Sequence, residues 1–364
     1  MTARHGLAKV SYLRVSVTDR CNQRCVYCMP AEGVPLKAHR DILSFEEIER
    51  VVRAAVTLGV RSVRLTGGEP LVRRGIVDLA RSLAAVPGLD DLSLTTNGVL
   101  LAGLSGPLRA AGVKRVNISF DTLRPDRYRA ITRTDHFREA WVGLEAALAA
   151  GFAPVKVNTV VIRGLNDDEV EDMALLAAGI GQAAGIGEAA VIGQAAGRLA
   201  SLGPALIWRF IELMPLGQGR VWGEAALVPA GEIAERLARL ADVRGLPFEE
   251  TSGAGDQTGE GRGPYGAGPA RYFRLGRGHV GVISPMTHGF CASCNRLRLS
   301  SDGQVHPCLA SPFAIDLAGP LRAGAPQAEL AALLAQAAEM KPQAHRMAER
   351  RPELSKRQMS KIGG

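Results

Sequence analysis

Short apolar runs, many of them β-branched, alternate along the chain with longer stretches in which apolar residues recur every three or four positions. The first pattern predicts buried strands, and the second predicts amphipathic helices. Between residues 13 and 214 these patterns predict six βα-type repeats. The six predicted strands are Leu13–Val17, Ser62–Thr66, Asp91–Thr96, Arg115–Phe120, Val155–Ile162 and Trp208–Leu213.

The helix between the first two strands has the clearest boundaries. Ser44 with Glu47 three residues later predicts a capping box, and Gly59 ends the helix. Strands separated by helices favour a parallel sheet covered by helices, either a partial barrel or a doubly wound sheet. In both folds, functional residues gather at the carboxyl ends of the strands. Further helices are predicted at Ile76–Val86, Leu101–Ala110, Phe137–Ala149 and Asp168–Ala178.

The pattern changes after Met214, so we divide the chain into residues 1–214, 215–340 and 341–364. Within the first part, residues 179–206 repeat the sequence IGQAAG and predict a surface insertion with no assigned function. The last part is a charged tail that ends in Gly363-Gly364, and we expect it to be disordered. The middle part predicts a helix at Pro229–Ala241, a Gly-rich linker at Gly253–Gly268, strands at Arg271–Leu275, His279–Ser284 and Arg296–Ser300, and a helix at Gln327–Met340.

Composition narrows the function classes. The 364 residues are 46% hydrophobic and 22% charged, which is ordinary for a soluble globular protein. The N-terminus lacks an apolar signal core, and no window approaches the roughly 20 apolar residues of a membrane span, so we expect a cytoplasmic protein without membrane contact. Lys plus Arg exceed Asp plus Glu by 44 − 36 = 8. This excess suits an anionic ligand such as a nucleotide, but the absence of a long basic run argues against nucleic-acid binding.

The six cysteines form two tight groups of three, which indicates metal binding rather than a disulfide framework. Cys21, Cys25 and Cys28 follow the first predicted strand, where a barrel has its active-site mouth. A structural zinc site needs four protein ligands, and no fourth cysteine or histidine is close. The group therefore favours a [4Fe–4S] cluster with one iron left open for a small molecule.

The second group, Cys291, Cys294 and Cys308, leaves two readings open. His288 and His306 are near enough in sequence to complete a Cys3His zinc site. An iron–sulfur cluster is favoured by the next strand, because Arg296 and Arg298 alternate along it and point from the same face. Two adjacent guanidinium groups favour a bound phosphate or carboxylate.

These motifs carry a family resemblance. CNQRCVYC resembles the cluster motif of radical S-adenosylmethionine enzymes, and TGGEP at Thr66–Pro70 resembles their second motif. Within that superfamily the chain resembles the GTP 3′,8-cyclases of molybdenum-cofactor biosynthesis, and only the insertion near 179–206 and the linker near 253–268 depart from them. The stretches that carry this closer resemblance are LRVSVTDRCNQRCVYCMP, RLTGGEPLVRR, NISFDTL, RFIELMPLG, FCASCNRLRLSSDGQVHPCL and the final GG.

The resemblance implies a fold and a reaction. The fold is a partial (βα)6 barrel of the TIM type, followed by a C-terminal α+β segment with a second [4Fe–4S] cluster. The activity is that of a lyase that converts GTP to (8S)-3′,8-cyclo-7,8-dihydroguanosine 5′-triphosphate, the first step towards molybdopterin. Reductive cleavage of S-adenosylmethionine gives a 5′-deoxyadenosyl radical that takes hydrogen from C3′ of GTP, and the new radical attacks C8. The catalytic group is therefore the cluster-bound S-adenosylmethionine and not a protein side chain.

The resemblance also implies site residues. Gly67 and Gly68 would let the backbone approach the methionine moiety, whose ammonium group Glu69 would bind. Arg14 and Lys156 lie within otherwise apolar strands, which favours a ligand site, whereas Arg64 alternates with apolar neighbours and could face outward. The implied S-adenosylmethionine contacts are Tyr27, Gly68, Ser119 and Met214. The implied GTP contacts are Arg14, Arg64, Thr95, Lys156, Arg296 and Arg298.

The implied partners are GTP, an electron donor and the next enzyme of the pathway, in a monomer or homodimer. The resemblance also suggests that Gly363-Gly364 enters the active site near Arg14. Two alternatives stay open. One is a radical S-adenosylmethionine enzyme with another substrate, whose second cluster only transfers electrons. The other is a non-catalytic zinc or iron–sulfur protein, which predicts two closed four-ligand sites.

Overall fold

A computed structural model of the chain describes residues 10–180, 205–251, 268–345, 347–349, 359 and 362. Most of the predicted insertion near 179–206 and of the Gly-rich linker near 253–268 lies outside these ranges, as does the Gly363-Gly364 end. In the part of the chain that the structure describes, no helix is long and apolar enough to cross a membrane.

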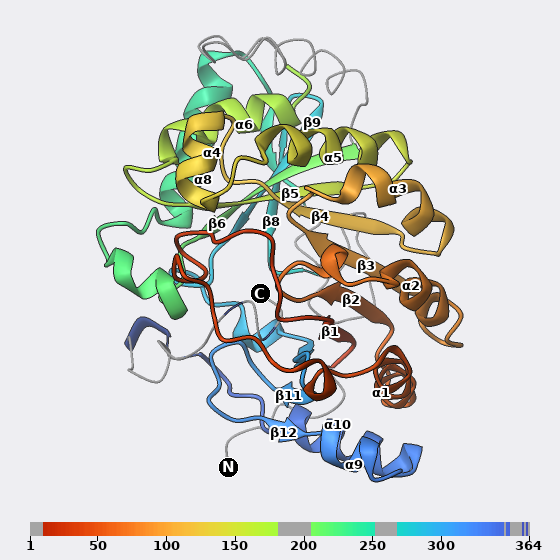
Figure 1. Ribbon diagram of the computed structural model, residues 1–364. Helices are drawn as coiled ribbons and strands as arrows, with labels where there is room; N and C mark the ends of the chain where they lie inside the picture. The colour runs from red at the N-terminus through yellow and green to blue at the C-terminus, as the bar shows by residue number, and fades with distance from the viewer. Residues whose placement is uncertain are drawn as a thin grey trace.

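One twelve-stranded sheet organises the described residues, in the order β12-β11-β10-β1-β2-β3-β4-β5-β6-β9-β8-β7. Strands β1 to β6 are parallel and pair in sequence order, as six βα repeats require. The sheet curves around a central space and carries its helices on the outside (Figure 1). This is the predicted partial barrel. The six strands are β1 (Tyr12–Ser16), β2 (Ser62–Thr66), β3 (Asp91–Thr96), β4 (Arg115–Ser119), β5 (Val155–Val161) and β6 (Leu206–Glu212).

The C-terminal part extends this sheet on both sides. Strand β9 (Gly278–Ile283) is parallel to β6, and β10 (Arg296–Leu299) is parallel to β1. The outer strands pair in antiparallel fashion. The division of the chain at residue 214 stays a prediction. The outer strands are β7 (Phe248–Glu250), β8 (Arg271–Leu275), β11 (Gln304–His306) and β12 (Ile315–Asp316).

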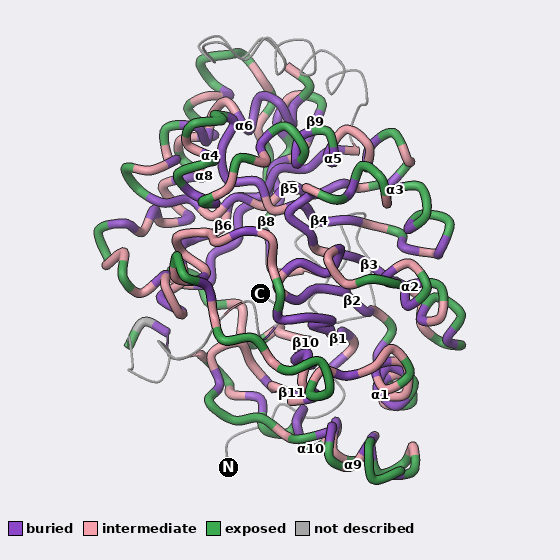
Figure 2. Tube along the Cα trace, viewed as in Figure 1, coloured by how far each residue is buried: buried purple, intermediate pink, exposed green. Residues whose placement is uncertain are grey.

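The outer helices bury one face each. Helix α1 (Phe45–Thr57) begins at the predicted capping box: the Glu47 amide donates to Ser44 Oγ at 3.2 Å, and the Ser44 amide donates to Glu47 Oε2 at 2.7 Å. Buried and exposed residues alternate along it, as the colours of Figure 2 show, and its buried residues are Ile48, Val51, Val52, Ala54 and Ala55. The other helices are α2 (Ile76–Ala84), α3 (Leu101–Ala110), α4 (Pro125–Thr132), α5 (Phe137–Ala149), α6 (Val170–Ala177), α8 (Ala230–Val243), α9 (Ala318–Arg322) and α10 (Gln327–Glu339).

Several elements were absent from the sequence prediction. They are the helices α4 and α9 and the strands β7, β11 and β12. Helix α4 has only eight residues and a mostly polar sequence, PDRYRAIT, and the three strands have two or three residues each. Segments this short are too brief to show a hydrophobic period.

The expectation of a disordered tail is wrong for its first residues. Lys341 lies two residues after the end of α10 and is buried, and Met347 packs against Leu216. Helix α10 itself packs against α1 on the outside of the barrel. The end of the described chain is therefore part of the folded structure.

The capping box of α1 gives a test of the fold. Replacing Ser44 by Ala removes the acceptor for the Glu47 amide, and we expect the free energy of unfolding to fall by about 1 kcal/mol. Ser44→Asp keeps an acceptor at this position and should retain most of the stability. Denaturant unfolding measures both changes. Equal stability of Ser44→Ala and the wild type would show that the cap contributes nothing.

Candidate active site

A cavity opens at the carboxyl ends of the parallel strands and has about 290 Å³ open to water molecules. Polar and charged side chains from the inner faces of the strands form its wall, and the first cysteine group lies at its mouth. Most of the predicted site residues border this one space. They are Arg14, Cys21, Cys25, Tyr27, Cys28, Arg64, Gly68, Thr95, Ser119, Met214, Arg296 and Arg298.

The strand register explains the cations in the wall. Arg14 on β1 lies beside Arg298 on β10 and beside Arg64 on β2. Because residues in register on parallel strands point to the same face, all three guanidinium groups project into the barrel. Arg64 therefore faces the cavity and not solvent. Its Nε donates to Ser93 Oγ at 3.1 Å.

Like charges at this density strongly favour an anion. Burial lowers the pKa of Arg14 well below its usual value, and the charge of Arg298 lowers it further. Burial and the charge of Arg296 lower the pKa of Arg298 to about 10. Arg296 lies over the Phe290 ring, with its guanidinium carbon 5.1 Å from the ring centre. A polyphosphate would compensate these charges.

Two predicted GTP contacts differ in placement. Thr95 borders the cavity, and its hydroxyl is buried without a hydrogen-bond partner among the described residues, which suits a hydroxyl contact to a ligand. Lys156 is buried but lies outside the cavity wall, with its Nζ 5.7 Å from the centre of the Tyr272 ring. Burial lowers the pKa of Lys156 well below its usual value, and Arg209 lowers it further.

Arg209 is a wall residue that the sequence analysis missed. It is 4% exposed, and its Nε donates to Asn158 Oδ1 at 2.9 Å. With its amide oriented to accept, Asn117 bonds both Arg64 and Arg209. The signal was present, because Arg209 interrupts an apolar strand as Arg14 and Lys156 do.

The loop that carries the first cysteine group is held by helix α4. The Arg24 amide donates to Thr132 O and the Val26 amide donates to Ile131 O, both at 2.9 Å. The last carbonyl groups of a helix have no partner within it, so this loop satisfies them. Arg133, which adopts a left-handed conformation with φ 57°, donates from its side chain to Arg24 O. Burial raises the pKa of Cys21 to about 11, so metal binding there must release a proton.

The Gly-Gly-Glu turn packs against the chain after β1. The Gly68 amide donates to Thr18 O and the Glu69 amide donates to Arg20 O, both at 2.8 Å. A Cβ atom on Gly68 would overlap Arg20 O, and one on Gly67 would overlap Thr18 O. The prediction explained both glycines by the approach of a ligand, whereas the contact that the structure shows is backbone against backbone.

The carboxylate of Glu69 borders the cavity and already accepts three hydrogen bonds from the protein. Its Oε1 accepts from the Leu71 amide at 3.0 Å and from Thr96 Oγ1 at 2.7 Å, and its Oε2 accepts from the Asn97 amide at 2.6 Å. Burial raises the pKa of Glu69 to about 7, although these hydrogen bonds lower it. The carboxylate is thus fixed in place and can still accept from an ammonium group.

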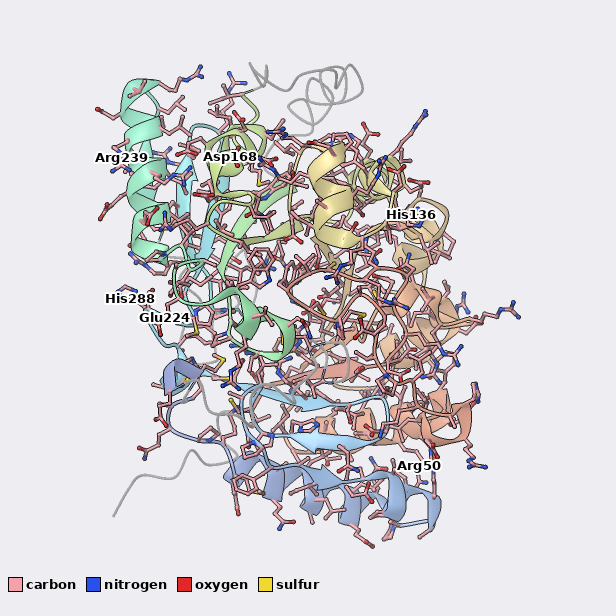
Figure 3. The ribbon with its side chains drawn as sticks, turned by 60° about the vertical axis from the view of Figure 1, so that its left-hand side comes forward. Arg50, His136, Asp168, Glu224, Arg239 and His288 are labelled. Atoms are coloured by element: carbon pink, nitrogen blue, oxygen red, sulfur yellow. The ribbon has the colours of Figure 1, made fainter. Side chains whose placement is uncertain are left out.

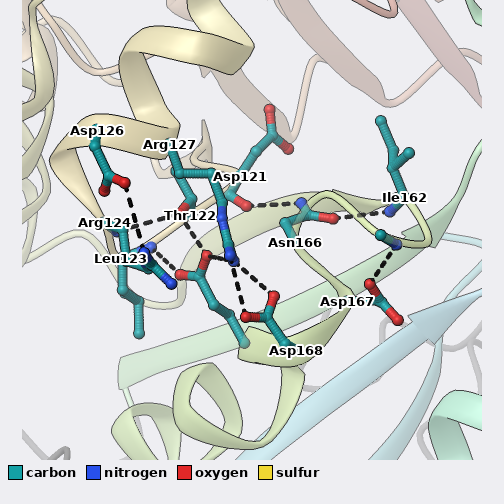
Figure 4. Close-up of polar contacts among 12 residues, drawn as sticks. Asp121, Thr122, Leu123, Arg124, Asp126, Arg127, Ile162, Asn166, Asp167 and Asp168 are labelled. Atoms are coloured by element: carbon teal, nitrogen blue, oxygen red, sulfur yellow. Dashed lines mark hydrogen bonds and ion pairs between the residues drawn. The ribbon is translucent and has the colours of Figure 1, made fainter. Parts of the chain in front are cut away.

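A polar network fixes Asp121, a second buried carboxylate in the wall. Tyr27 Oη donates to Asp121 Oδ2 at 2.6 Å, and the Val160 amide donates to Asp121 Oδ1 at 2.9 Å. Figure 4 shows how Asn166 supports this position, because its Nδ2 donates to Asp121 O at 2.8 Å and its Oδ1 accepts from the Ile162 amide at 2.8 Å. Burial raises the pKa of Asp121 to about 6. The network joins the loops after β4 and β5.

The second cysteine group lies at the open end of the β10–β11 hairpin. Arg298 pairs with His306 across the hairpin, so Cys294 before β10 and Cys308 after β11 come to the same end. Their neighbours Phe290, Arg296 and Leu309 border the cavity. Burial raises the pKa of Cys294, but Arg296 and Lys341 lower it more, and the result is about 6.

The alternative of a zinc ion finds no support in the donor set. Within residues 10–180, 205–251 and 268–345 and the few described residues beyond them, no three His, Cys, Asp or Glu side chains converge closely enough to hold a single metal ion. His288, a candidate fourth ligand, is exposed at the edge of the molecule (Figure 3) and lies 3.2 Å from Thr287 Oγ1. The described residues therefore do not show the Cys3His donor set that a structural zinc site needs.

Glu212 joins the barrel to the second cysteine group. It is fully buried at the end of β6, and its carboxylate accepts from the Ala230 amide at 2.7 Å, the Met286 amide at 2.7 Å and the Thr287 amide at 3.0 Å. These donors belong to the start of α8 and to the loop before Cys291. The sequence analysis did not single out this residue.

Comparisons with known proteins bear on this site. Residues 15–177 match the family model of the radical SAM superfamily, and residues 206–347 match that of Molybdenum Cofactor Synthesis C. The chain is 49% identical to the GTP 3′,8-cyclase of Moorella thermoacetica over 98% of both chains. The chain belongs to the GTP 3′,8-cyclase family. It is also 47% identical to the GTP 3′,8-cyclase of Pelotomaculum thermopropionicum, again over 98% of both chains.

Membership of the GTP 3′,8-cyclase family confirms the predicted resemblance. A solved structure agrees on the fold: the crystal structure of Streptococcus suis SuiB bound to precursor peptide SuiA matches with a TM-score of 0.50 and 13% identity. The match covers 83% of this chain and 60% of SuiB. Which of the site residues bind S-adenosylmethionine and which bind GTP stays a prediction.

The Gly68 contact gives a test of the turn. Gly68→Ala should lower the free energy of unfolding by roughly 1–3 kcal/mol and reduce the iron bound beside Cys21, because the added methyl group pushes Arg20 away. Gly103→Ala is the matched control, since Gly103 lies on the exposed face of α3 with nothing near its Cβ position. That control should gain roughly 0.5–1 kcal/mol. Denaturant unfolding and iron analysis measure both variants, and an unchanged Gly68→Ala would contradict the packing argument.

Proposed function

We propose that this protein is a radical S-adenosylmethionine GTP 3′,8-cyclase. It converts GTP to (8S)-3′,8-cyclo-7,8-dihydroguanosine 5′-triphosphate and so joins C3′ of the ribose to C8 of the base. The observation that carries the proposal is the row of inward arginines in a cavity that the first cysteine group lines, and whose wall includes the neighbours of the second group, Phe290, Arg296 and Leu309. The GTP 3′,8-cyclases that match over 98% of the chain support it.

The cysteine groups would hold two [4Fe–4S] clusters. Cys21, Cys25 and Cys28 would supply three thiolates to the first cluster and would leave its fourth iron open to S-adenosylmethionine. When bound, the cluster and S-adenosylmethionine would supply the one-electron cleavage of S-adenosylmethionine that leads to the substrate radical. Tyr27, Gly68, Ser119 and Met214 would contact S-adenosylmethionine, and the fixed carboxylate of Glu69 would bind its ammonium group.

The second group would orient the substrate. Cys291, Cys294 and Cys308 would hold a cluster whose open iron takes the guanine. Arginine pairs with phosphate in a bidentate geometry, and the burial of Arg14 and Arg298 strengthens each contact. The negative charge of a triphosphate would thereby compensate the mutual repulsion of the buried arginines Arg14 and Arg298. The side chains that would bind GTP are Arg14, Arg64, Thr95, Lys156, Arg296 and Arg298.

The reaction needs partners beyond GTP. A one-electron donor must reach the first cluster, and the next enzyme of the pathway takes the product. The six free cysteines suit a reducing cytoplasm. A monomer or homodimer is compatible with a cavity that lies within one chain.

An anaerobic assay tests the function. Reconstituted protein with S-adenosylmethionine, a reductant and GTP should form 5′-deoxyadenosine and the cyclic product, and iron analysis should find about eight irons per chain.

Cys25→Ser should abolish cleavage of S-adenosylmethionine. Cys294→Ser should retain the first cluster and its cleavage activity but impair GTP turnover. Zinc in either site, or normal cleavage by Cys25→Ser, would refute the assignment of that site.

The arginine row predicts the affinity for GTP. Arg298→Ala and Arg296→Ala should each weaken GTP binding by about 10–100-fold, because each removes a charge-assisted contact. Added salt should weaken binding by the wild type as well. Arg81→Ala is the control, since Arg81 lies exposed on α2 and pairs with Asp78. Equilibrium dialysis under anaerobic conditions measures the affinities, and unchanged values in the two wall variants would refute the anion site.

A further inference from the structure

We propose that Lys341 is a positioning residue of the second cysteine group, and that its ammonium charge raises the reduction potential of the cluster held there. The inference deepens the proposed function and rests on it in one respect, the binding of an iron–sulfur cluster by Cys291, Cys294 and Cys308. Lys341 is the first residue of the predicted tail, and no role for it follows from the sequence.

The Lys341 ammonium group joins the two arms of the cysteine hairpin. Its Nζ donates to Arg296 O at 2.7 Å on the arm that follows Cys294, and to Pro307 O at 3.1 Å on the arm that precedes Cys308. Its third contact is with Cys294 Sγ at 3.6 Å. The three donors of the ammonium group are thus all directed at the frame of the cysteine group.

The placement of Lys341 is itself fixed. The residue lies two positions after the end of α10, its amide donates to Ala338 O at 3.2 Å, and only 8% of it is exposed. Four residues later the His345 amide donates to Cys291 Sγ at 3.3 Å. One short segment therefore contacts the sulfur atoms of two of the three cysteines.

These contacts have an electrostatic consequence. Hydrogen bonds to ligand sulfur atoms and nearby positive charge both stabilise the more negative, reduced state of an iron–sulfur cluster. Lys341 supplies both at Cys294, in a buried position where screening is weak. A second consequence is mechanical, because the same group holds Cys294 and Cys308 at a constant separation.

Lys341 is separate from the substrate wall. Arg296 and Arg298 border the cavity, whereas Lys341 does not. The two arginines therefore line the cavity, while the lysine contacts the cysteine group from outside the cavity wall. A change at Lys341 can alter the cluster without removing a GTP contact.

The test compares three variants in the reconstituted holoenzyme, by potentiometric titration followed by electron paramagnetic resonance. Lys341→Met removes the charge and the donors at similar volume, and Lys341→Arg keeps both. Lys114→Met is the control for net charge, because Lys114 is exposed before β4, at the end of the barrel away from the cavity. A Cys25→Ala background assigns the signal to the second cluster.

In Lys341→Met we expect the ratio of reduced to oxidised second cluster at a fixed potential to fall about tenfold, which is about 59 mV for a one-electron couple. Lys341→Arg and Lys114→Met should stay within a few-fold of the wild type. Selective loss of about four irons from Lys341→Met, with the first cluster retained, would also support the positioning role.

An unchanged ratio in a Lys341→Met protein that retains its second cluster would overturn the inference. A Lys341→Arg protein that behaves like Lys341→Met would overturn the role of the charge. Wild-type protein with iron at the first group alone would instead refute the proposed function, and the inference with it. The iron count of the wild type therefore distinguishes the two failures.

Discussion

The parallel pairing of β1 with β10 is the contact on which the site depends. It places Arg298 beside Arg14 and brings the open end of the β10–β11 hairpin to the mouth of the barrel. Without this pairing, β1 would be an edge strand of the sheet. The N-terminal and C-terminal parts of the chain thus share one cavity because they share one sheet.

Charge distinguishes this cavity from an ordinary barrel interior. The interior of a TIM-type barrel is normally filled by apolar side chains, whereas here Arg14, Arg64, Arg209 and Arg298 occupy it. Their desolvation and mutual repulsion oppose folding unless hydrogen bonds and a counter-charge compensate them. Asn117 and Asn158 provide part of the compensation. A bound polyanion would complete it, so the property that weakens the free protein favours its ligand.

The sequence was a good guide wherever a local pattern was long enough. All six barrel strands lie within two residues of their predicted bounds, and the cysteine spacing with Thr66–Pro70 located the mouth of the site. Helix α4 could not be predicted, because its eight mostly polar residues show no hydrophobic period. Its carbonyl groups nevertheless hold the cysteine loop. The roles of Glu212 and Lys341 could not be predicted for another reason. Their partners are backbone groups far away in sequence, which no motif records.

The pairing of β1 with β10 also bears on the order in which the chain folds and binds metal. Residue 12 of β1 finds its partner only at residue 296, so a ribosome must make most of the chain before the barrel can acquire that edge. Contacts between such distant residues form late, because a long loop must close first. Iron delivered to a nascent chain would meet the first cysteine group in an unfinished pocket exposed to water. Metallation of this enzyme is therefore expected to follow translation.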